Sequence, residues 1–251
     1  MSDSTLRHDA TARAHAPAQS RVSAAPAVTR GGIDWLFVVA VLLVAATFVR
    51  VFWFTPLEAL QGAAQKIFYV HLPAAFIALY IAFPLVVLMS VLFLWLKDLR
   101  FDRIAEASAE VGVVFMTVVL TTGPLWGKPI WGTWWTWDAR LTLTLFLWFM
   151  YVGYLVLRGA IEDAQMRARY SAVLGILGAL LIPFIHLSVY LFRTLHPKPI
   201  VLKPDAPSLP PEMLATLLLS FLSFTVLYVA LLRARVRLAA ERAALEMEDR
   251  R

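Results

Sequence analysis

The sequence contains no cysteine. Disulfides, thiolate metal sites and thiol-exchange chemistry are therefore excluded, and any redox or metal function must use histidine, methionine, carboxylates or a bound cofactor. The Walker-type phosphate-binding motif is also missing, so this chain does not itself hydrolyse ATP by that route. These absences leave non-covalent cofactor chemistry and membrane functions as the main classes to consider.

Charged residues are scarce. They make up 16% of the 251 residues, against about 25% in an average soluble domain, while 60% of the residues are apolar. The apolar residues come in long uninterrupted runs, which a soluble core does not need. The formal net charge of +6 is therefore interpreted as anchoring cytoplasmic ends in a membrane, and nucleic acid is not an expected partner.

Six apolar runs predict an all-α fold, a bundle of six transmembrane helices over residues 33–232. A bilayer core about 30 Å thick requires about 20 helical residues. Residues 1–32, rich in Ala, Ser and Arg, are expected to form a disordered cytoplasmic leader, and residues 233–251 a cytoplasmic extension of the last helix. The third and fourth runs are the shortest. The runs cover residues 33–54, 67–96, 111–127, 141–157, 170–192 and 213–232.

The distribution of Lys and Arg predicts the orientation of the spans, because cytoplasmic segments carry an excess of these residues. Of the 23 basic residues, 16 lie in the leader, in the tail and in the short connections near residues 97–103 and 158–169. With both termini in the cytoplasm, the connections after the first, third and fifth spans face the periplasm. A multi-pass protein of a bacterial inner membrane is expected.

A tryptophan-rich segment, predicted as a periplasmic loop over residues 123–140, is the most distinctive feature. An interfacial aromatic belt would spread Trp over several helix ends, whereas here the residues are clustered. Indole faces can instead stack on a large flat ligand, and Gly123, Gly127 and Gly132 would let the backbone turn or approach it. Five of the nine tryptophans lie within twelve residues: Trp126, Trp131, Trp134, Trp135 and Trp137.

His71 and His186 lie in charge-poor apolar runs. In the predicted orientation both lie about 6–9 Å below the periplasmic surface, at about 1.5 Å per helical residue. A lone membrane histidine often only bonds a neighbouring helix, but two at one depth beside an aromatic platform indicate a functional pair. Imidazole is a common axial ligand of haem iron, so His71 and His186 are candidate metal ligands.

Charges lie at the rim of this predicted site. Lys66, Lys128 and Arg140 could each be an ordinary snorkelling residue at a helix end, but together they could bind the propionates of a haem. Asp138 is expected to cap the fourth span, to order the loop through backbone N–H groups or to pair with Arg140. His196, in a polar connection, is expected to be solvated.

The same residues resemble a known family. Residues 126–129 read WGKP, residues 131–135 WGTWW and residues 137–142 WDARLT, which closely resemble the WWD domain of the cytochrome c maturation protein C family, also called haem exporter protein C. Residues 69–75 (YVHLPAA) and 183–189 (PFIHLSV) resemble the two haem-ligand segments of that family. The resemblance covers most of residues 33–232.

The resemblance implies a six-helix membrane protein that is not an enzyme in the narrow sense. Members of the family hold haem b on the periplasmic side between two histidines and the Trp loop, and present it to a periplasmic haem chaperone. The implied partners are an ATP-binding-cassette subunit, a second membrane subunit, a small single-span helper and membrane lipid. The ligand roles would fall on His71 and His186, and the platform role on the five clustered tryptophans, with Asp138 and the rim cations beside them.

Two alternative functions are open. A b-type cytochrome that carries electrons across the bilayer between two haems would need four helix histidines, and only His71 and His186 lie within the predicted spans. A permease that moves haem through the bilayer would favour polar or broken helices; Pro73, Pro84 and Pro183 leave room for this, but no charged lining lies mid-membrane.

Overall fold

The structure is a computed structural model that describes residues 33–201, 203–204, 206 and 208–249, with side chains up to residue 245. From Asp34 onward the chain forms one structural unit. The expected leader, residues 1–32, lies outside the described residues, as do residues 250–251 of the expected tail. The predicted helical extension of the last span is present, because α8 continues to Asp249.

The described residues contain helices and no β-strand, and six segments are long and apolar enough to cross a membrane. The chain is therefore an all-α, multi-pass membrane protein, as predicted. The spans are Trp35–Phe54, Ala63–Leu96, Leu99–Trp131, Ala139–Ala160, Ala164–Leu191 and Pro211–Leu245. Their elements are α1 (Trp35–Val49), η1 (Arg50–Phe54), η2 (Ala63–Ile67), α2 (Phe68–Phe76), η3 (Ile77–Ala82), α3 (Phe83–Leu96), α4 (Leu99–Trp131), α5 (Ala139–Ala160), α6 (Ala164–Ala179), α7 (Leu181–Leu191) and α8 (Pro211–Asp249).

Prolines interrupt two of the spans. A proline in a helix has no N–H to donate, and its ring clashes with the carbonyl four residues earlier. Immediately before Pro84 the chain forms the π-helix η3, which carries Tyr80. Before Pro183 the fifth span breaks at Leu180, where α6 passes into α7, and His186 follows on the first turn after Pro183. Both irregularities lie next to residues of the candidate site.

The centre of the bundle is closely packed between α3, α4, α5 and α6. The rings of Phe83 and Tyr151 stack with centroids 3.8 Å apart and planes inclined by 10°. Gly112 of α4 allows this contact, because a Cβ there would lie 2.7 Å from Cε1 of Phe83. Ser108 donates to the carbonyl of Ala82 and lies 2.8 Å from the hydroxyl of Tyr228, which joins α4, η3 and α8.

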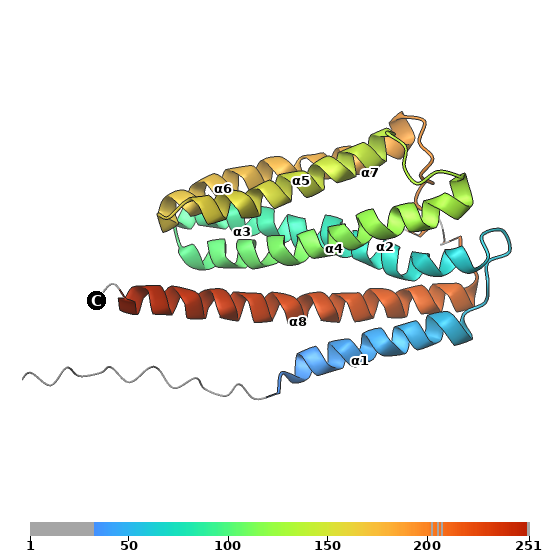
Figure 1. Ribbon diagram of the computed structural model, residues 1–251, viewed down its shortest axis with the longest axis horizontal. Helices are drawn as coiled ribbons and strands as arrows, with labels where there is room; N and C mark the ends of the chain where they lie inside the picture. Colours follow the sequence, from blue (N-terminus) through green and yellow to red (C-terminus); the bar gives the residue numbers. More distant parts are fainter. Residues whose placement is uncertain (1–32, 202, 205, 207, 250–251) are drawn as a thin grey trace, which may run out of the picture. The chain divides into compact units, whose positions relative to one another are not determined.

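The first span contacts the rest of the unit mainly through α8 (Figure 1), which lies between α1 and the helices α2 and α4. Polar side chains join the two helices. The hydroxyls of Thr47 and Ser223 lie 2.9 Å apart, and the hydroxyl of Thr216 lies 2.9 Å from that of Thr55 while accepting from Nε of Arg50 at 3.0 Å. In a membrane, such interhelical hydrogen bonds hold helices together where lipid offers no hydrophobic drive.

The end of the bundle where α4 begins is held by ion pairs. Arg158, at the end of α5, forms two hydrogen bonds of 2.6 and 2.8 Å to the carboxylate of Asp102 and a third of 2.9 Å to Glu106. Arg235 of α8 pairs with Glu110. The three carboxylates are spaced four residues apart, so they share one face of α4 and connect it to α5 and α8.

The structure shortens the predicted tryptophan-rich loop. Helix α4 continues to Trp131, and Pro124, Gly127 and Pro129 lie inside it. It ends at Gly132, whose φ of 76° lies in the left-handed region that glycine adopts without steric cost. The third and fourth runs, the shortest by sequence, are full-length spans, because polar residues at their ends also belong to the helices.

Candidate functional site

A cavity of about 480 Å³ lies at the end of the bundle where α4 ends and α5 begins. Its walls come from η2, α2, η3, α4, α5, α7 and α8 and from the connections between η1 and η2, between α4 and α5 and between α7 and α8. Its volume lies within the range of about 300–1,000 Å³ that is usual for small-molecule and cofactor sites. The site residues predicted from sequence that line it are His71, His186, Trp126, Trp131, Trp134, Trp135 and Arg140.

His71 projects from α2 and is held against α4. Its Nδ1 lies 3.0 Å from Oγ1 of Thr122, and its ring meets that of Trp126 edge to face at a centroid distance of 5.8 Å. The imidazole lies beside Gly123, where a Cβ would be in ordinary contact with Cε1 of His71 at 3.4 Å. The ring is therefore fixed through its Nδ1 edge.

His186 comes from α7 and lines the same cavity. Its Nδ1 lies 3.0 Å from the hydroxyl of Tyr80, which the π-helix η3 carries. Its ring also lies near that of Tyr190, with centroids 6.2 Å apart. Among the hydrogen bonds of the described residues, neither His186 nor His71 uses Nε2, so each imidazole keeps one nitrogen for another ligand.

The clustered tryptophans divide into three groups. Trp126 and Trp131 lie on α4, where the indole N–H of Trp126 donates to Oε1 of Gln61 at 3.0 Å. Trp134 and Trp135 lie on the connection to α5 and also line the cavity, with Trp134 56% exposed. Trp137 is 77% exposed and does not line the cavity; its ring meets Trp135 edge to face at 5.9 Å. Four of the five clustered tryptophans therefore line one cavity.

Two buried donors in the cavity wall lack a hydrogen-bond partner among the described residues. They are Nη1 of Arg140 and the indole Nε1 of Trp135. A buried donor without a partner costs about 1–3 kcal/mol, and such a group in a native structure calls for an acceptor. A guanidinium and an indole N–H are both donors that a carboxylate accepts.

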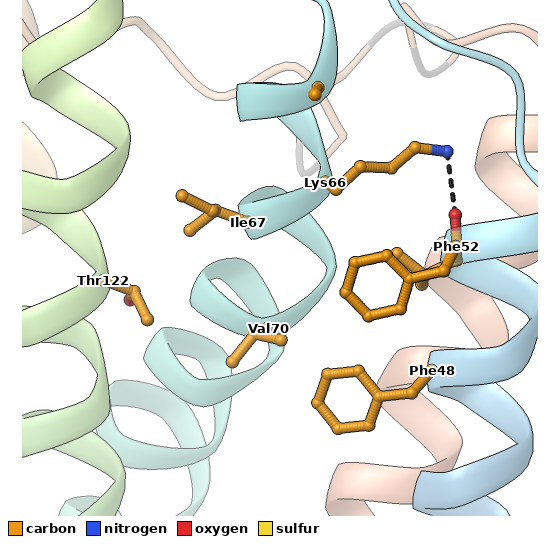
Figure 2. A pocket seen from close by; sticks show the side chains of 8 residues that line it. Phe48, Phe52, Lys66, Ile67, Val70 and Thr122 are labelled. Atoms are coloured by element: carbon orange, nitrogen blue, oxygen red, sulfur yellow. Dashed lines mark hydrogen bonds between the residues drawn. The ribbon is translucent and has the colours of Figure 1, made fainter.

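Lys66 and Lys128 do not line the cavity. The ammonium of Lys66 donates to the carbonyl of Val51 at 2.8 Å and to the carbonyl of Thr55. These hydrogen bonds join η2 to the end of the first span. Figure 2 shows this side chain at a separate apolar pocket of about 220 Å³ between α1, η1 and α2. Lys128 donates to the carbonyl of Gly132 at 2.9 Å and so closes the end of α4.

Asp138 lies outside the cavity as well and has the capping role expected from sequence. Its Oδ1 accepts from the N–H of Leu141 at 3.0 Å at the start of α5. Its Oδ2 accepts from the N–H of Leu195 at 3.3 Å. One carboxylate therefore fixes the start of α5 and ties it to the connection between α7 and α8. The expected pairing with Arg140 is absent from the ion pairs of the described residues.

The expectation that His196 is solvated was wrong. His196 lines the cavity and is only partly exposed, because Asp138 draws its connection over the site. Its Nδ1 donates to the carbonyl of Pro197 at 2.9 Å. Burial, and secondly the positive charge of Arg140, lower the pKa of His196 to about 4, so the ring is neutral at pH 7.

Comparison with known proteins identifies the family. The model of the family described as "Heme exporter protein C" matches residues 18–250. The chain belongs to that family. Relatives named Heme exporter protein C include those of Bradyrhizobium diazoefficiens (36% identity over 84% of this chain and 80% of the relative), Haemophilus influenzae (37%, 74% and 75%) and Escherichia coli strain K12 (35%, 82% and 82%).

Sequence reasoning missed several residues of the site in this member of the Heme exporter protein C family. Tyr80, Thr122 and Gln61 each hold a side chain of the cavity by a hydrogen bond. Thr122 could have been found, because it directly precedes the tryptophan-rich segment. Tyr80 and Gln61 carry no local signal, since only the packing of distant segments brings them to the site.

Proposed function

We propose that the chain binds one haem b in this cavity at the periplasmic face and presents it to a periplasmic haem chaperone during cytochrome c maturation. The observation that carries the proposal is the pairing of His71 and His186. Both line one cavity, and each is held through Nδ1 with Nε2 unused. Imidazoles held through one nitrogen are the usual ligands of a metal at the other. The chain's family supports a role in haem export and cytochrome c maturation.

The remaining residues of the cavity fit the rest of a haem. Arg140 and Trp135, the two donors without partners, suit a propionate. Trp126, Trp131 and Trp134 offer indole surface for the porphyrin. His71 and His186 would hold the iron of a bound haem, which would supply the group that the chaperone takes up.

Several predicted site residues lie outside the cavity and hold nearby chain segments in place. We assign Lys66 and Lys128 to bracing helix ends away from the haem, because their ammonium groups donate to backbone carbonyls. Asp138 holds two chain segments together, and Trp137, exposed against Trp135, is suited to contact the chaperone. Trp134 lines the cavity and is 56% exposed, which suits a protein that passes its ligand on.

The protein acts by binding and presentation and not as an enzyme. It works in the inner membrane with both termini cytoplasmic, beside an ATP-binding-cassette subunit, a second membrane subunit and a small single-span helper. All three histidines among the described residues line the one cavity. This favours a single haem site over a chain of haems that conducts electrons across the bilayer.

The test is the visible spectrum of the purified protein, with and without co-expression of the partner subunits. The unmodified chain is expected to show a six-coordinate haem, and His71→Ala and His186→Ala each to change the spectrum or to empty the site. Lys66→Gln, outside the cavity, is the control and should keep the haem bands. Absence of haem from the unmodified chain, or unchanged bands in both histidine variants, would refute the assignment.

Presentation is tested separately by loading of the chaperone. Trp134→Ala and Trp137→Ala should reduce transfer more than haem content, because they lie at the exposed side of the site. Asp138→Asn should loosen the loop without changing the ligation of the iron. Wild-type haem content and wild-type transfer in all three variants would show that the segment is only an interfacial anchor.

A further inference from the structure

The two candidate ligands differ in the group that faces Nδ1. At His71 it is the hydroxyl of Thr122, whose Oγ1 also lies 2.6 Å from the carbonyl oxygen of Val118. Two oxygens at that distance repel each other unless a hydrogen lies between them. A hydroxyl has one hydrogen, so the proton of Thr122 points to Val118 and its lone pairs face His71.

This geometry determines the tautomer of His71. An oxygen that only accepts requires a donor on the other side, so Nδ1 of His71 carries the proton in the neutral ring. Nε2 then has its lone pair available before any ligand arrives. The ring also meets that of Trp126 edge to face, which holds it in the same pose.

The tautomer of His186 is not determined in this way. The hydroxyl of Tyr80 has Nδ1 of His186 as its one partner among the hydrogen bonds of the described residues. It can therefore donate to Nδ1, which leaves the proton on Nε2, or accept from Nδ1. The contact is also exposed, whereas that of His71 with Thr122 is partly buried.

We propose that Thr122 is a positioning residue that presets His71 as the preformed iron ligand, while Tyr80 leaves His186 free to adopt either tautomer. This rests on the proposed haem site. His71 is ready to bind at Nε2, and its Nδ1–H bond to Thr122 strengthens it as a ligand. His186 must first place its proton on Nδ1. The two axial positions are therefore unequal, although the sequence presents them as a pair.

The first experiment uses the haem-free full-length protein, labelled with 15N-histidine, in detergent at pH 7.5. His71 is expected to show the Nδ1–H tautomer, with its signals assigned through His71→Gln. Thr122→Val should abolish this preference and Thr122→Ser should preserve it, since serine keeps the hydroxyl. Thr121→Val is the matched control, because Thr121 also bonds back to α4 but is exposed and has no hydrogen bond to the histidine. An Nε2–H tautomer at His71 in the unmodified protein overturns the proposal.

The second experiment measures haem retention and the reduction potential of the loaded protein. Loss of a partner to a metal-bound histidine typically weakens affinity by about 10–100-fold. Thr122→Val should fall in that range and raise the reduction potential, because a less basic ligand stabilises ferric iron less. Thr122→Ser and Thr121→Val should match the unmodified protein, and Tyr80→Phe should cost less than Thr122→Val. Equal losses in Tyr80→Phe and Thr122→Val would contradict the inequality of the two ligands.

The two experiments fail independently. If the unmodified protein binds no haem, the proposed function is wrong, yet the tautomer of His71 is still measured. If haem binds but His71 carries its proton on Nε2, the haem site stands and the role assigned to Thr122 is refuted.

Discussion

Arg140 and Trp135 show how single atoms define the chemistry of the cavity. Each has a buried donor without a partner among the described residues, and both line the same space. Natural proteins satisfy nearly all such donors. Two such donors on residues that line one cavity favour a ligand that carries hydrogen-bond acceptors.

Replacing Arg140 with Gln should weaken haem retention by about tenfold or more, since a hydrogen bond to a charged group contributes about 1.5–3 kcal/mol. Arg140→Lys should recover only part of this, because lysine lacks the planar fork of donors. The measurement compares haem with its dimethyl ester, in which the propionates are blocked. Esterification should weaken binding to the unmodified protein but not to Arg140→Gln. Equal sensitivity in both would place the propionates elsewhere.

The lowered pKa of His196 predicts that the stability of the connection between α7 and α8 depends on pH. Its folded pKa of about 4 lies below the ordinary value of 6.5, so the unfolded segment binds more protons between these values. Stability of the closed connection is complete above pH 6.5 and falls as the pH drops toward 4. Hydrogen exchange of residues 192–201, corrected for intrinsic rates, should show this loosening. His196→Gln should remove it; a segment equally protected at pH 7 and pH 4.5 would contradict the prediction.

At the scale of elements, local sequence predicts where the helices become irregular. Which side chains these irregularities bring together depends on distant segments of the chain. Pro183 predicts a break in the fifth span, and the break occurs at Leu180. The left-handed cap at Gly132 ends α4 in the same local way. The π-helix before Pro84 turns Tyr80 toward His186, more than a hundred residues away, and no local pattern predicts that partner.

We expect that breaking the ion pairs between α4 and α5 lowers the free energy of unfolding strongly. Arg158 and Asp102 are 5% and 6% exposed, so Arg158→Ala would leave a buried carboxylate without its partner. Breaking a buried pair in this way costs about 3–5 kcal/mol. The unfolding free energy in mixed micelles measures it, with Arg100→Ala, at the surface pair with Asp98, as the control that should change little. Similar stability of the two variants would show that the pair is not effectively buried.

At the scale of the whole molecule, the unequal distribution of basic residues predicts the side of the membrane on which the cavity opens. Both termini are expected in the cytoplasm and the segment after α4 in the periplasm. Reporter fusions at Gly132 and at the C terminus should therefore report opposite sides. Signals from the same side would invalidate the orientation and, with it, the periplasmic haem site.

The sequence by itself determined the six spans, the family, and the two histidines and four tryptophans that line the cavity. Hydropathy depends on local composition, so the apolar runs predicted the helices, and clustered Trp residues marked one wall of the site. The ends of α4 were less predictable, because polar residues such as Asp102 stay helical when distant partners neutralise them.

The tertiary structure alone decided the roles of individual side chains. It moved His196 into the cavity, excluded Lys66 and Lys128 from it, and brought Tyr80 and Thr122 to the two histidines. The physical reason is that a hydrogen bond depends on the position of both partners to within a few tenths of an ångström. Sequence spacing gives that precision within a helical turn, but between spans it arises only from packing.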